Sequence, residues 1–275
     1  MGISVVIPAH DAAPWLAEAI GSVIAQEVPA QIIVVDDGSS DETAEVAARF
    51  AEVQVLRHNA SRGPSAARNT GARAATNDAV LFLDADDRLL PGALAHAAAC
   101  MAANPQAAFV YGAHRRVDAD WHPQTPPALE RCGPDARLAF LRTNCVGMIA
   151  TALFDRAKLL AVGHFDEALH QCEDYDLFLR LALRWPVACH THLMPNIAST
   201  APIPRAIRQG CWWRRGRCRR DTSHLIRPGR RRWREGGANG RVPMHWRRGA
   251  TMRAFRSRAL PGKGGAWPVL PLLHR

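Results

Sequence analysis

The sequence predicts an α/β protein with an open, mainly parallel sheet and helices on both faces. First, short apolar runs alternate with segments of helical period along residues 3–111. Second, several of these runs are continuously apolar, as at residues 32–35, which is typical of strands covered on both faces. Third, the chain has 275 residues, of which 48% are hydrophobic and 22% charged, so it is long enough to build a large core.

Strands and helices are expected to alternate along the first half of the chain. The expected strands are residues 4–7, 32–35, 53–56, 80–83 and 108–111, each a short apolar run. The expected helices are residues 15–24, 41–50, 64–75 and a fourth that begins at Pro91. The first has apolar residues at helical spacing, the second begins with two acids, and proline begins the last two. Because parallel strands need such crossover helices, this order indicates an open sheet.

The second half of the chain has a weaker pattern. A proline-rich connection covers residues 117–137, and an apolar stretch at 146–154 and a helix near 175–184 follow it. The strand or helix pattern is lost at residues 189–195. We therefore expect one domain whose two halves are residues 1–116 and 117–195, followed by a separate tail at residues 196–275.

The tail differs sharply from the rest in charge. Residues 1–195 contain 15 Lys and Arg against 23 Asp and Glu, whereas residues 196–275 contain 20 basic and 2 acidic residues. The tail also holds 19 of the arginines and five of the eight tryptophans, but only one lysine, Lys263. Three interpretations stay open: a basic arm for nucleic acid or anionic lipid, a disordered solvated tail, and the product of a shifted reading frame. The scarcity of lysine and the lack of periodicity favour the third.

Cysteine usage and hydropathy suggest a cytoplasmic protein. The seven cysteines form an odd set without a Cys-x-x-Cys pair, which favours free thiols in a reducing compartment. No run approaches the ~20 apolar residues that a membrane-spanning helix needs, and the first residues lack the basic segment of a signal peptide. Residues 189–192 (Cys-His-Thr-His) offer metal-binding side chains, but an ordinary loop is the favoured interpretation because no second ligand pair stands at zinc spacing.

Acidic residues follow two of the expected strands, at the strand ends where open α/β sheets bind their ligands. These acids are Asp36 and Asp37 after the second strand, and Asp84, Asp86 and Asp87 after the fourth. Clustered carboxylates raise one another's pKa unless a cation lies between them. A divalent ion shared with substrate phosphates would resolve this conflict in the second cluster. One helix cap needs only one acid, so the cluster at residues 84–87 favours a function, whereas Asp41 alone is expected to be a cap or a solvated turn residue.

Four segments together resemble the family 2 inverting glycosyltransferases, which have the nucleotide-sugar-binding GT-A fold. These segments read ISVVIPAH at residues 3–10, VVDDGSSD at 34–41, GPSAARNTG at 63–71 and LDADD at 83–87. They occur in the family's order, and the resemblance covers about residues 3–190. It implies that residues 1–116 bind a nucleotide-diphosphate sugar and that residues 117–195 serve the acceptor.

The resemblance also implies roles for the residues that bind the donor. Pro8, Ala9 and His10 would line the nucleotide pocket. Asp37, with Asp36 beside it, would accept a hydrogen bond from the imide N–H of a base, which favours a UDP-type donor.

The same resemblance places a metal ion at the second acidic cluster. Asp84 and Asp86 match the Asp-X-Asp motif and would contact the ribose and the donor diphosphate. Asp86 and Asp87 are the candidate ligands of Mn²⁺ or Mg²⁺. Arg68 either faces the donor or is a surface cation of its helix, and both alternatives stay open.

Catalysis is expected from the acids that precede the helix near residues 175–184. The resemblance identifies Asp174 as the catalytic base, with Glu173 and Asp176 as neighbours that position it or the acceptor. An inverting transfer needs a base within reach of the acceptor hydroxyl, on the face opposite the leaving nucleotide. The structural alternative is that these acids only charge the first turn of a helix.

The expected reaction is a single displacement in polysaccharide or glycoconjugate synthesis. The acceptor would be a sugar, a lipid-linked molecule or another hydroxyl compound, with peripheral contact to the inner face of a membrane and no specific nucleic acid. One alternative is a nucleotidyltransferase-like enzyme, although the first strand is not followed by a Gly-rich phosphate loop. Another is a non-catalytic carrier of a tail that binds nucleic acid or a membrane.

Overall fold

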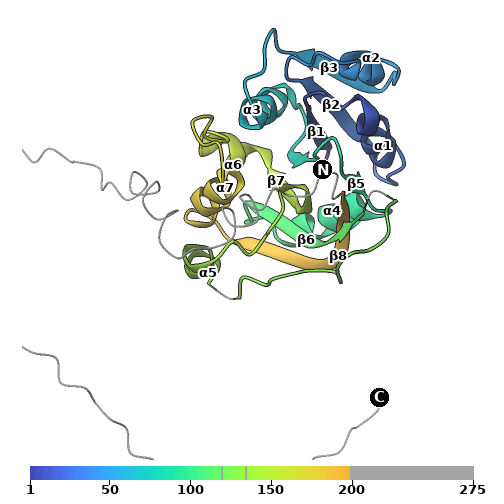
Figure 1. Ribbon diagram of the computed structural model, residues 1–275. Coiled ribbons are helices and arrows are strands. Elements are labelled where there is room, and N and C mark those ends of the chain that lie inside the picture. Colours follow the sequence, from blue (N-terminus) through green and yellow to red (C-terminus); the bar gives the residue numbers. More distant parts are fainter. Residues whose placement is uncertain (119, 134, 199–275) are drawn as a thin grey trace, which may run out of the picture. The chain divides into compact units, whose positions relative to one another are not determined.

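The computed structural model describes residues 1–118, 120–133 and 135–198. Within these residues the chain forms one eight-stranded sheet with a layer of helices on each face (Figure 1). From residue 199 onward, the tail lies outside the described part of the chain, and so do its three interpretations. None of the helices in the described ranges has the length and apolar character that a bilayer-spanning helix requires.

The first half of the chain follows the predicted alternation, except for the short strand β5, which the sequence did not predict. Its elements are β1 (Ile3–Ala9), α1 (Ala13–Ile24), β2 (Ala30–Asp36), α2 (Thr43–Ala48), β3 (Val53–Arg57), α3 (Pro64–Ala74), β4 (Ala79–Phe82), β5 (Arg88–Leu89), α4 (Ala93–Ala103) and β6 (Phe109–Val117). The second half contributes α5 (Ala136–Arg142), a 3-10 turn at Ile149–Thr151, β7 (Ala152–Asp155), α6 (Arg156–Ala161), α7 (Glu173–Ala182) and β8 (Val187–Ala198).

The sheet has the strand order β3-β2-β1-β4-β7-β6-β8-β5. Strands β3, β2, β1 and β4 are parallel neighbours, and β6 is parallel to β8. Strand β7 is antiparallel to both β4 and β6, and the short β5 is antiparallel to β8. The prediction of a mainly parallel sheet is confirmed, and the antiparallel strands of the second half make it mixed.

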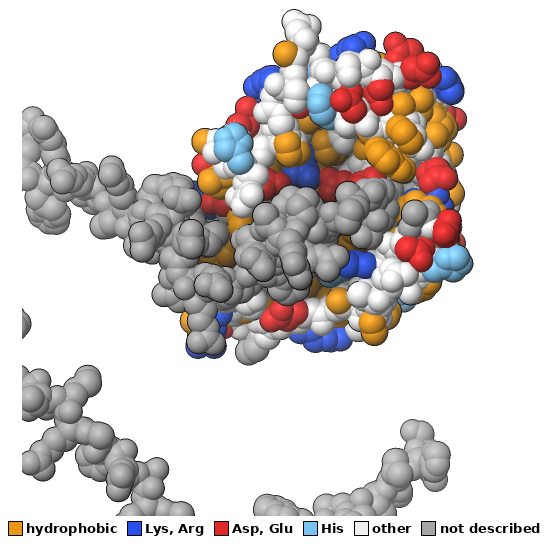
Figure 2. All heavy atoms as spheres, viewed as in Figure 1, with side chains coloured by type: hydrophobic (Ala, Val, Ile, Leu, Met, Phe, Trp, Pro, Cys, Tyr) orange, Lys and Arg blue, Asp and Glu red, His pale blue; other side chains and the backbone are white. Residues whose placement is uncertain are grey.

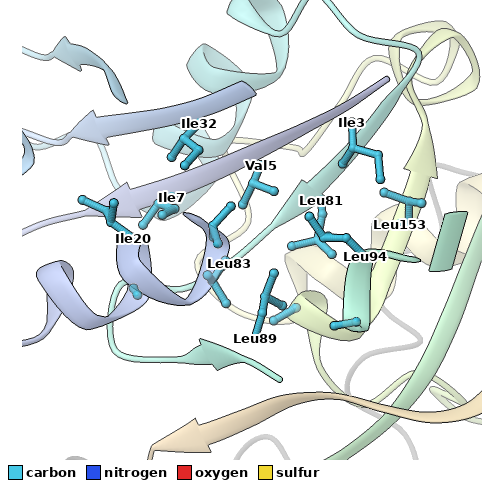
Figure 3. Packing of buried hydrophobic residues seen from close by; sticks show 14 of the residues in the cluster. Ile3, Val5, Ile7, Ile20, Ile32, Leu81, Leu83, Leu89, Leu94 and Leu153 are labelled. Atoms are coloured by element: carbon cyan, nitrogen blue, oxygen red, sulfur yellow. The ribbon is translucent and has the colours of Figure 1, made fainter. Parts of the chain in front are cut away.

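The core lies on both faces of the sheet because successive side chains of a strand point to opposite sides. All of β1 is buried. Ile3, Val5 and Ile7 belong to the core cluster that includes α1, α2 and α4, and Val6 belongs to the cluster on the other face, which includes α3, α5, α6 and α7. Figure 3 shows the first of these faces, where Ile20 of α1 lies over the β1 side chains. Strands buried on both faces explain the continuous apolar runs in the sequence.

Strand β8 corrects the expectation for residues 189–195. These residues lie in a strand that pairs with β6 and β5, although they carry no apolar alternation. Pro195 hides the strand in the sequence, because proline usually excludes a central strand. Here Pro195 lies opposite Leu89 of the two-residue β5, where few ladder hydrogen bonds are needed. The strand also continues to Ala198, past the domain boundary expected at residue 195.

The histidines of residues 189–192 therefore belong to packing between β8 and α4, and not to a loop. His192 stacks on His96 of α4, with ring centroids 3.2 Å apart. His190 is partly buried beside them, and no hydrogen-bond partner of its ring nitrogens lies within the described residues. Burial, together with His192 and His96, lowers the pKa of His190 to about 4. His190 is therefore neutral at pH 7.

Helix α3 lies unusually close to β1 at Gly71. A Cβ atom at this position would lie 2.2 Å from Cγ1 of Val6, which is far inside van der Waals contact. Val6 is fully buried in the sheet, so it has no room to move aside. The approach of α3 to the sheet therefore depends on glycine at this position.

We expect Gly71→Ala to destabilise the protein by about 1–3 kcal/mol through overpacking against Val6. Gly21→Ala is the matched control, because Gly21 also lies in a helix but has open space around its Cβ position. Gly21→Ala should raise stability by up to about 1 kcal/mol through helix propensity. Denaturant melts of both variants check this, and equal effects of the two changes would contradict it.

Candidate active site

A cavity of about 300 Å³ opens at the carboxyl ends of β1, β2 and β4. Its wall comes from four segments: residues 8–15, Asp37, residues 61–67 and residues 84–86. Figure 2 shows acidic side chains in the middle of one face of the molecule. The cavity lies where ligands bind in open α/β sheets, and it brings together the two acid-bearing strand ends that the sequence predicted.

The segment after β1 is fixed by the loop after β2. Pro8, Ala9 and His10 lie on the cavity wall, and Nδ1 of His10 is 3.0 Å from the backbone oxygen of Asp37. The amide of Ala12 donates to Oγ1 of Thr43 (2.8 Å), and that of Ala13 donates to Oδ2 of Asp41 (3.1 Å).

These contacts also settle the place of Asp41. Its carboxylate accepts from the amides of Ala13 and Thr43, at the starts of α1 and α2, although the N-cap residues of these helices are Ala12 and Glu42. The first amides of α1 are used in these contacts, and Pro14 has no N–H to offer. The N-terminus of α1 is therefore not an open anion site of the kind found in phosphate-binding loops.

Asp37 organises the loop at residues 61–63. Its carboxylate accepts from Nδ1 of His58 (2.6 Å), Oγ of Ser61 (2.9 Å) and the amides of Arg62 and Gly63 (2.9 and 2.8 Å). Burial alone would raise the pKa of Asp37, but these hydrogen bonds outweigh burial and lower it. Asp37 is therefore a carboxylate at neutral pH that holds one wall of the cavity.

Asp36 does not reach the cavity. Its side chain is fully buried, lies 3.1 Å from Nε of Arg57 and accepts from the amide of Ser39 at 2.9 Å. The structure therefore places Asp36 in the support of the strand end, behind Asp37.

The second acidic cluster forms a tight turn. The amide of Asp87 donates to the backbone oxygen of Asp84 (3.0 Å), and Asp84, Ala85 and Asp86 lie on the cavity wall. Asp87 is 2% exposed and is not part of that wall. The turn is held at its far end by β5, where Arg88 pairs with Asn196 of β8.

Arg68 connects this cluster to the acids of α7. It is 6% exposed, and its guanidinium donates to Oδ1 of Asp84 (2.8 Å) and to Oε1 of Glu173 (3.1 Å). It also lies over the ring of Phe165, 5.5 Å from the centroid. Burial alone would lower the pKa of Arg68, but Asp84 and Glu173 outweigh burial and raise it. Arg68 is therefore a buried cation and not a surface one, and it is not among the residues of the cavity wall.

Asp174 stands beside this bridge with an unusual pKa. Burial and the charge of Glu173 raise the pKa of Asp174 to about 6, although the Tyr175 amide donates to its carboxylate at 2.6 Å. A carboxylate with a pKa near 6 is ionised at pH 7 and still basic enough to accept a proton. Asp176 differs, because it is buried in an ion pair with Arg180 at 2.8 Å.

Sequence reasoning did not single out Asn69, which holds the loop before α7. Its amide group donates to the backbone oxygen of Phe165 (3.0 Å) and accepts from the Phe165 amide (2.9 Å). Nδ2 also donates to Glu167 at 3.0 Å. Asn69 neighbours Arg68 on α3, so one helix fixes both the loop and the acids that follow it. The sequence shows the neighbouring Arg68 and Asn69, but it does not identify their partners, which lie about 100 residues away.

The charge of the cavity decides what it can bind. Within the described residues its wall carries Asp37, Asp84 and Asp86 but no Lys or Arg. A diphosphate would meet carboxylates there unless a divalent cation lay between them. Carboxylate oxygens are the ligands that Mn²⁺ and Mg²⁺ prefer, so the donor set at Asp84 and Asp86 fits such an ion.

Comparisons with known proteins agree with this geometry. The family model described as Glycosyl transferase family 2 matches residues 4–161. Succinoglycan biosynthesis protein ExoU of Rhizobium meliloti (strain 1021) is 32% identical over 195 residues, which are 65% of this chain and 56% of that protein. The pre-mycofactocin glycosyltransferase of Mycobacterium tuberculosis (strain ATCC 25618 / H37Rv) is 32% identical over 196 residues, 65% of this chain and 38% of that protein. The chain thus matches about half or less of the length of these relatives.

Solved structures share the fold. The crystal structure of S. aureus TarS 1-349 in complex with UDP-GlcNAc has a TM-score of 0.61 at 21% identity and covers 73% of this chain and 59% of that one. Mannosyltransferase PcManGT from Pyrobaculum calidifontis, in complex with GDP-Man and Mn2+, has a TM-score of 0.57 at 21% identity and covers 74% and 57%. At this identity the likeness shows the fold alone.

Removing the buried cation should be costly. We expect Arg68→Met to destabilise the protein by about 3–5 kcal/mol, because it leaves two partly buried carboxylates, Asp84 and Glu173, without their cationic partner. Arg62→Met is the matched control: its ion pair with Glu167 is exposed, so about 1 kcal/mol or less should be lost. Chemical denaturation at pH 7 measures both losses of stability, and equal losses would refute the bridge.

Proposed function

Because the chain belongs to glycosyltransferase family 2, we propose that it transfers a sugar from a nucleotide-diphosphate donor to an acceptor hydroxyl, with inversion at the anomeric carbon. The observation that carries the proposal is the bridge through Arg68. It binds Asp84, on the wall of the donor cavity, and Glu173, next to the candidate base Asp174. Donor-binding and proton-accepting groups thereby belong to one site, as a single displacement requires.

The nucleotide is proposed to lie against the ends of β1 and β2. Pro8, Ala9 and His10 offer a surface of mixed polarity for the nucleoside. The buried carboxylate of Asp37 already accepts from four donors, so we assign it first to shaping residues 61–63. If the Ser61 hydroxyl turns away, Asp37 gains capacity to accept from the imide N–H of uracil. This supports a UDP-type donor as the first to test.

The donor diphosphate is proposed to lie over the turn at residues 84–87, together with Mn²⁺ or Mg²⁺. Asp84 and Asp86 would hold the ion, because both carboxylates belong to the cavity wall. When bound, the ion neutralises charge on the departing nucleoside diphosphate. We propose that Asp87, which is buried, supports the turn instead of entering the cavity, and that Asp36 supports β2 in the same manner.

Asp174 is proposed to be the general base. As the acceptor oxygen forms its bond to the anomeric carbon, the bond from that carbon to the diphosphate oxygen breaks, and Asp174 takes the hydroxyl proton. Glu173 is held by Arg68, and its negative charge raises the pKa of Asp174, which makes Asp174 a stronger base. Glu173 therefore acts through its neighbour as a positioning residue.

The acceptor is proposed to be a sugar, a lipid-linked molecule or another hydroxyl compound in polysaccharide or glycoconjugate synthesis. The name of the relative from Rhizobium meliloti, a succinoglycan biosynthesis protein, supports this direction. A nucleotidyltransferase gains no support, because the start of α1 offers no phosphate loop. The carrier alternative depends on residues beyond 198, which are outside the described ranges.

Asp174→Asn should lower the turnover rate by about 10²- to 10⁴-fold, because the amide cannot take the proton. In the wild type, activity should rise with pH through about 6, where Asp174 loses its proton, and level off above it.

The raised pKa of Asp174 also affects folding stability. Because the pKa is 3.8 in the unfolded chain and about 6 in the folded one, Asp174 lowers stability as the pH rises from 3.8 toward 6. Asp174→Asn should therefore be at least as stable as the wild type at pH 7.

The assay for this prediction measures release of nucleoside diphosphate across pH 5–8, with thermal melts in parallel. Asp120→Asn is the control, since it replaces an exposed aspartate by the same amide. Full activity in Asp174→Asn would remove the base assignment.

Nucleotide and metal together should stabilise the chain. At a hundredfold excess over its Kd, UDP with Mn²⁺ should add about 2.7 kcal/mol, and UDP alone should add much less because the cavity wall is acidic. Asp86→Asn should lose most of this gain, whereas Glu52→Gln, an exposed acid elsewhere, should keep it. Thermal shifts with UDP, GDP and dTDP, each with and without Mn²⁺, measure this. A melt that ignores every nucleotide would contradict the proposed function.

A further inference from the structure

Trp15 is a large aromatic side chain that the fold leaves exposed at the donor cavity. It lies in the first turn of α1, is 40% exposed and forms part of the cavity wall. The other large hydrophobic side chains that are exposed in the described ranges are Met1, Ile24, Leu138 and Leu141, and none of them lies on this wall. The burial of Leu16, Ala19 and Ile20 already attaches α1 to the sheet. The core therefore does not account for an indole at position 15.

The position of Trp15 is fixed before any ligand arrives. The residues that precede it are held by Thr43 and Asp41, whose side chains accept from the amides of Ala12 and Ala13. Pro14 fixes the backbone at the start of the helix, and the Trp15 amide donates to the Ala12 oxygen at 3.1 Å. An aromatic ring with few torsions on an anchored helix end contacts a ligand at low entropic cost.

The surroundings of Trp15 indicate which part of a donor it meets. Trp15 follows Pro8, Ala9 and Ala12 along the chain, and these give the cavity a small-residue, apolar side. The catalytic acids of α7 are not part of the cavity wall. A flat apolar ring beside small apolar residues matches a nucleoside better than it matches a diphosphate, which the carboxylates and a cation serve.

We propose that Trp15 is a donor-binding residue that packs its indole against the nucleoside of a nucleoside diphosphate. This inference rests on the proposed function. It adds a donor-binding residue that lies outside the four segments, residues 3–10, 34–41, 63–71 and 83–87, on which the resemblance is based. Contacts of bases with aromatic side chains contribute enough to change affinity by about tenfold when the ring is removed. Because the indole contacts the nucleoside and not the sugar, we expect Trp15 to contribute to the binding of UDP as well as of a UDP-sugar.

The test measures binding of UDP with Mn²⁺ to the full chain by isothermal titration calorimetry. Trp15→Ala should bind about tenfold more weakly, and Trp15→Phe should recover most of the affinity because a flat ring remains. Ile24→Ala is the matched control: Ile24 is a similarly exposed apolar side chain at the other end of α1, 44% exposed and outside the cavity wall. Its affinity should equal that of the wild type. Quenching of tryptophan fluorescence by UDP should also diminish in Trp15→Phe.

Three results would overturn the inference. If Trp15→Ala binds UDP like the wild type, the indole does not contact the nucleotide. If only UDP-GlcNAc binding weakens and UDP binding does not, the contact is with the sugar and the nucleoside assignment is wrong. If the wild type itself binds neither UDP, GDP nor dTDP in the presence of Mn²⁺, the proposed function fails and this inference falls with it. Thermal melts of each variant separate a loss of binding from a loss of folding.

Discussion

The site depends on one buried cation between two carboxylates. Arg68 is nearly inaccessible to solvent and binds Asp84 and Glu173, which come from opposite halves of the chain. Burying a charge is tolerated only when ion pairs and hydrogen bonds replace the lost hydration. Here Asp84 and Glu173 replace the hydration of the Arg68 guanidinium. The bridge joins the end of β4 to the start of α7, and burial together with the charge of Glu173 raises the pKa of the neighbouring Asp174 to about 6, which suits a base.

Helix α3 is the element that makes this bridge possible. Gly71 lets the helix approach β1, and Arg68 and Asn69, on the same helix, reach the acids of α7 and the loop that precedes it. Arg68 and Asn69 are neighbours on α3, but their partners lie about 100 residues further along the chain. Contacts of this one helix therefore join residues from both halves of the chain.

The first half of the fold could be predicted from the sequence because its signals are local. Apolar runs, helical periodicity and acids at strand ends each lie within a few residues, so the strands and the cavity edge followed from them. The partner of Arg68 could not be predicted, since Glu173 lies 105 residues away. Strand β8 was hidden by its histidines and Pro195, and β5 has only two residues to show a pattern. The roles of the site residues came from resemblance to a family, because composition does not distinguish a structural aspartate such as Asp36 from a ligand-binding one.

The pairing of β5 with β8 has a consequence for how the site is made during synthesis. The turn at residues 84–87 is secured on one side by β4, but on the other by the contact of Arg88 with Asn196. A chain that leaves the ribosome with its N-terminus first can assemble β1 to β4 early, while the acidic turn still lacks its outer support. Only when residue 196 has emerged does the edge close. Completion of the donor site is thus coupled to the last strand that the structure describes, and not to the motifs at its start.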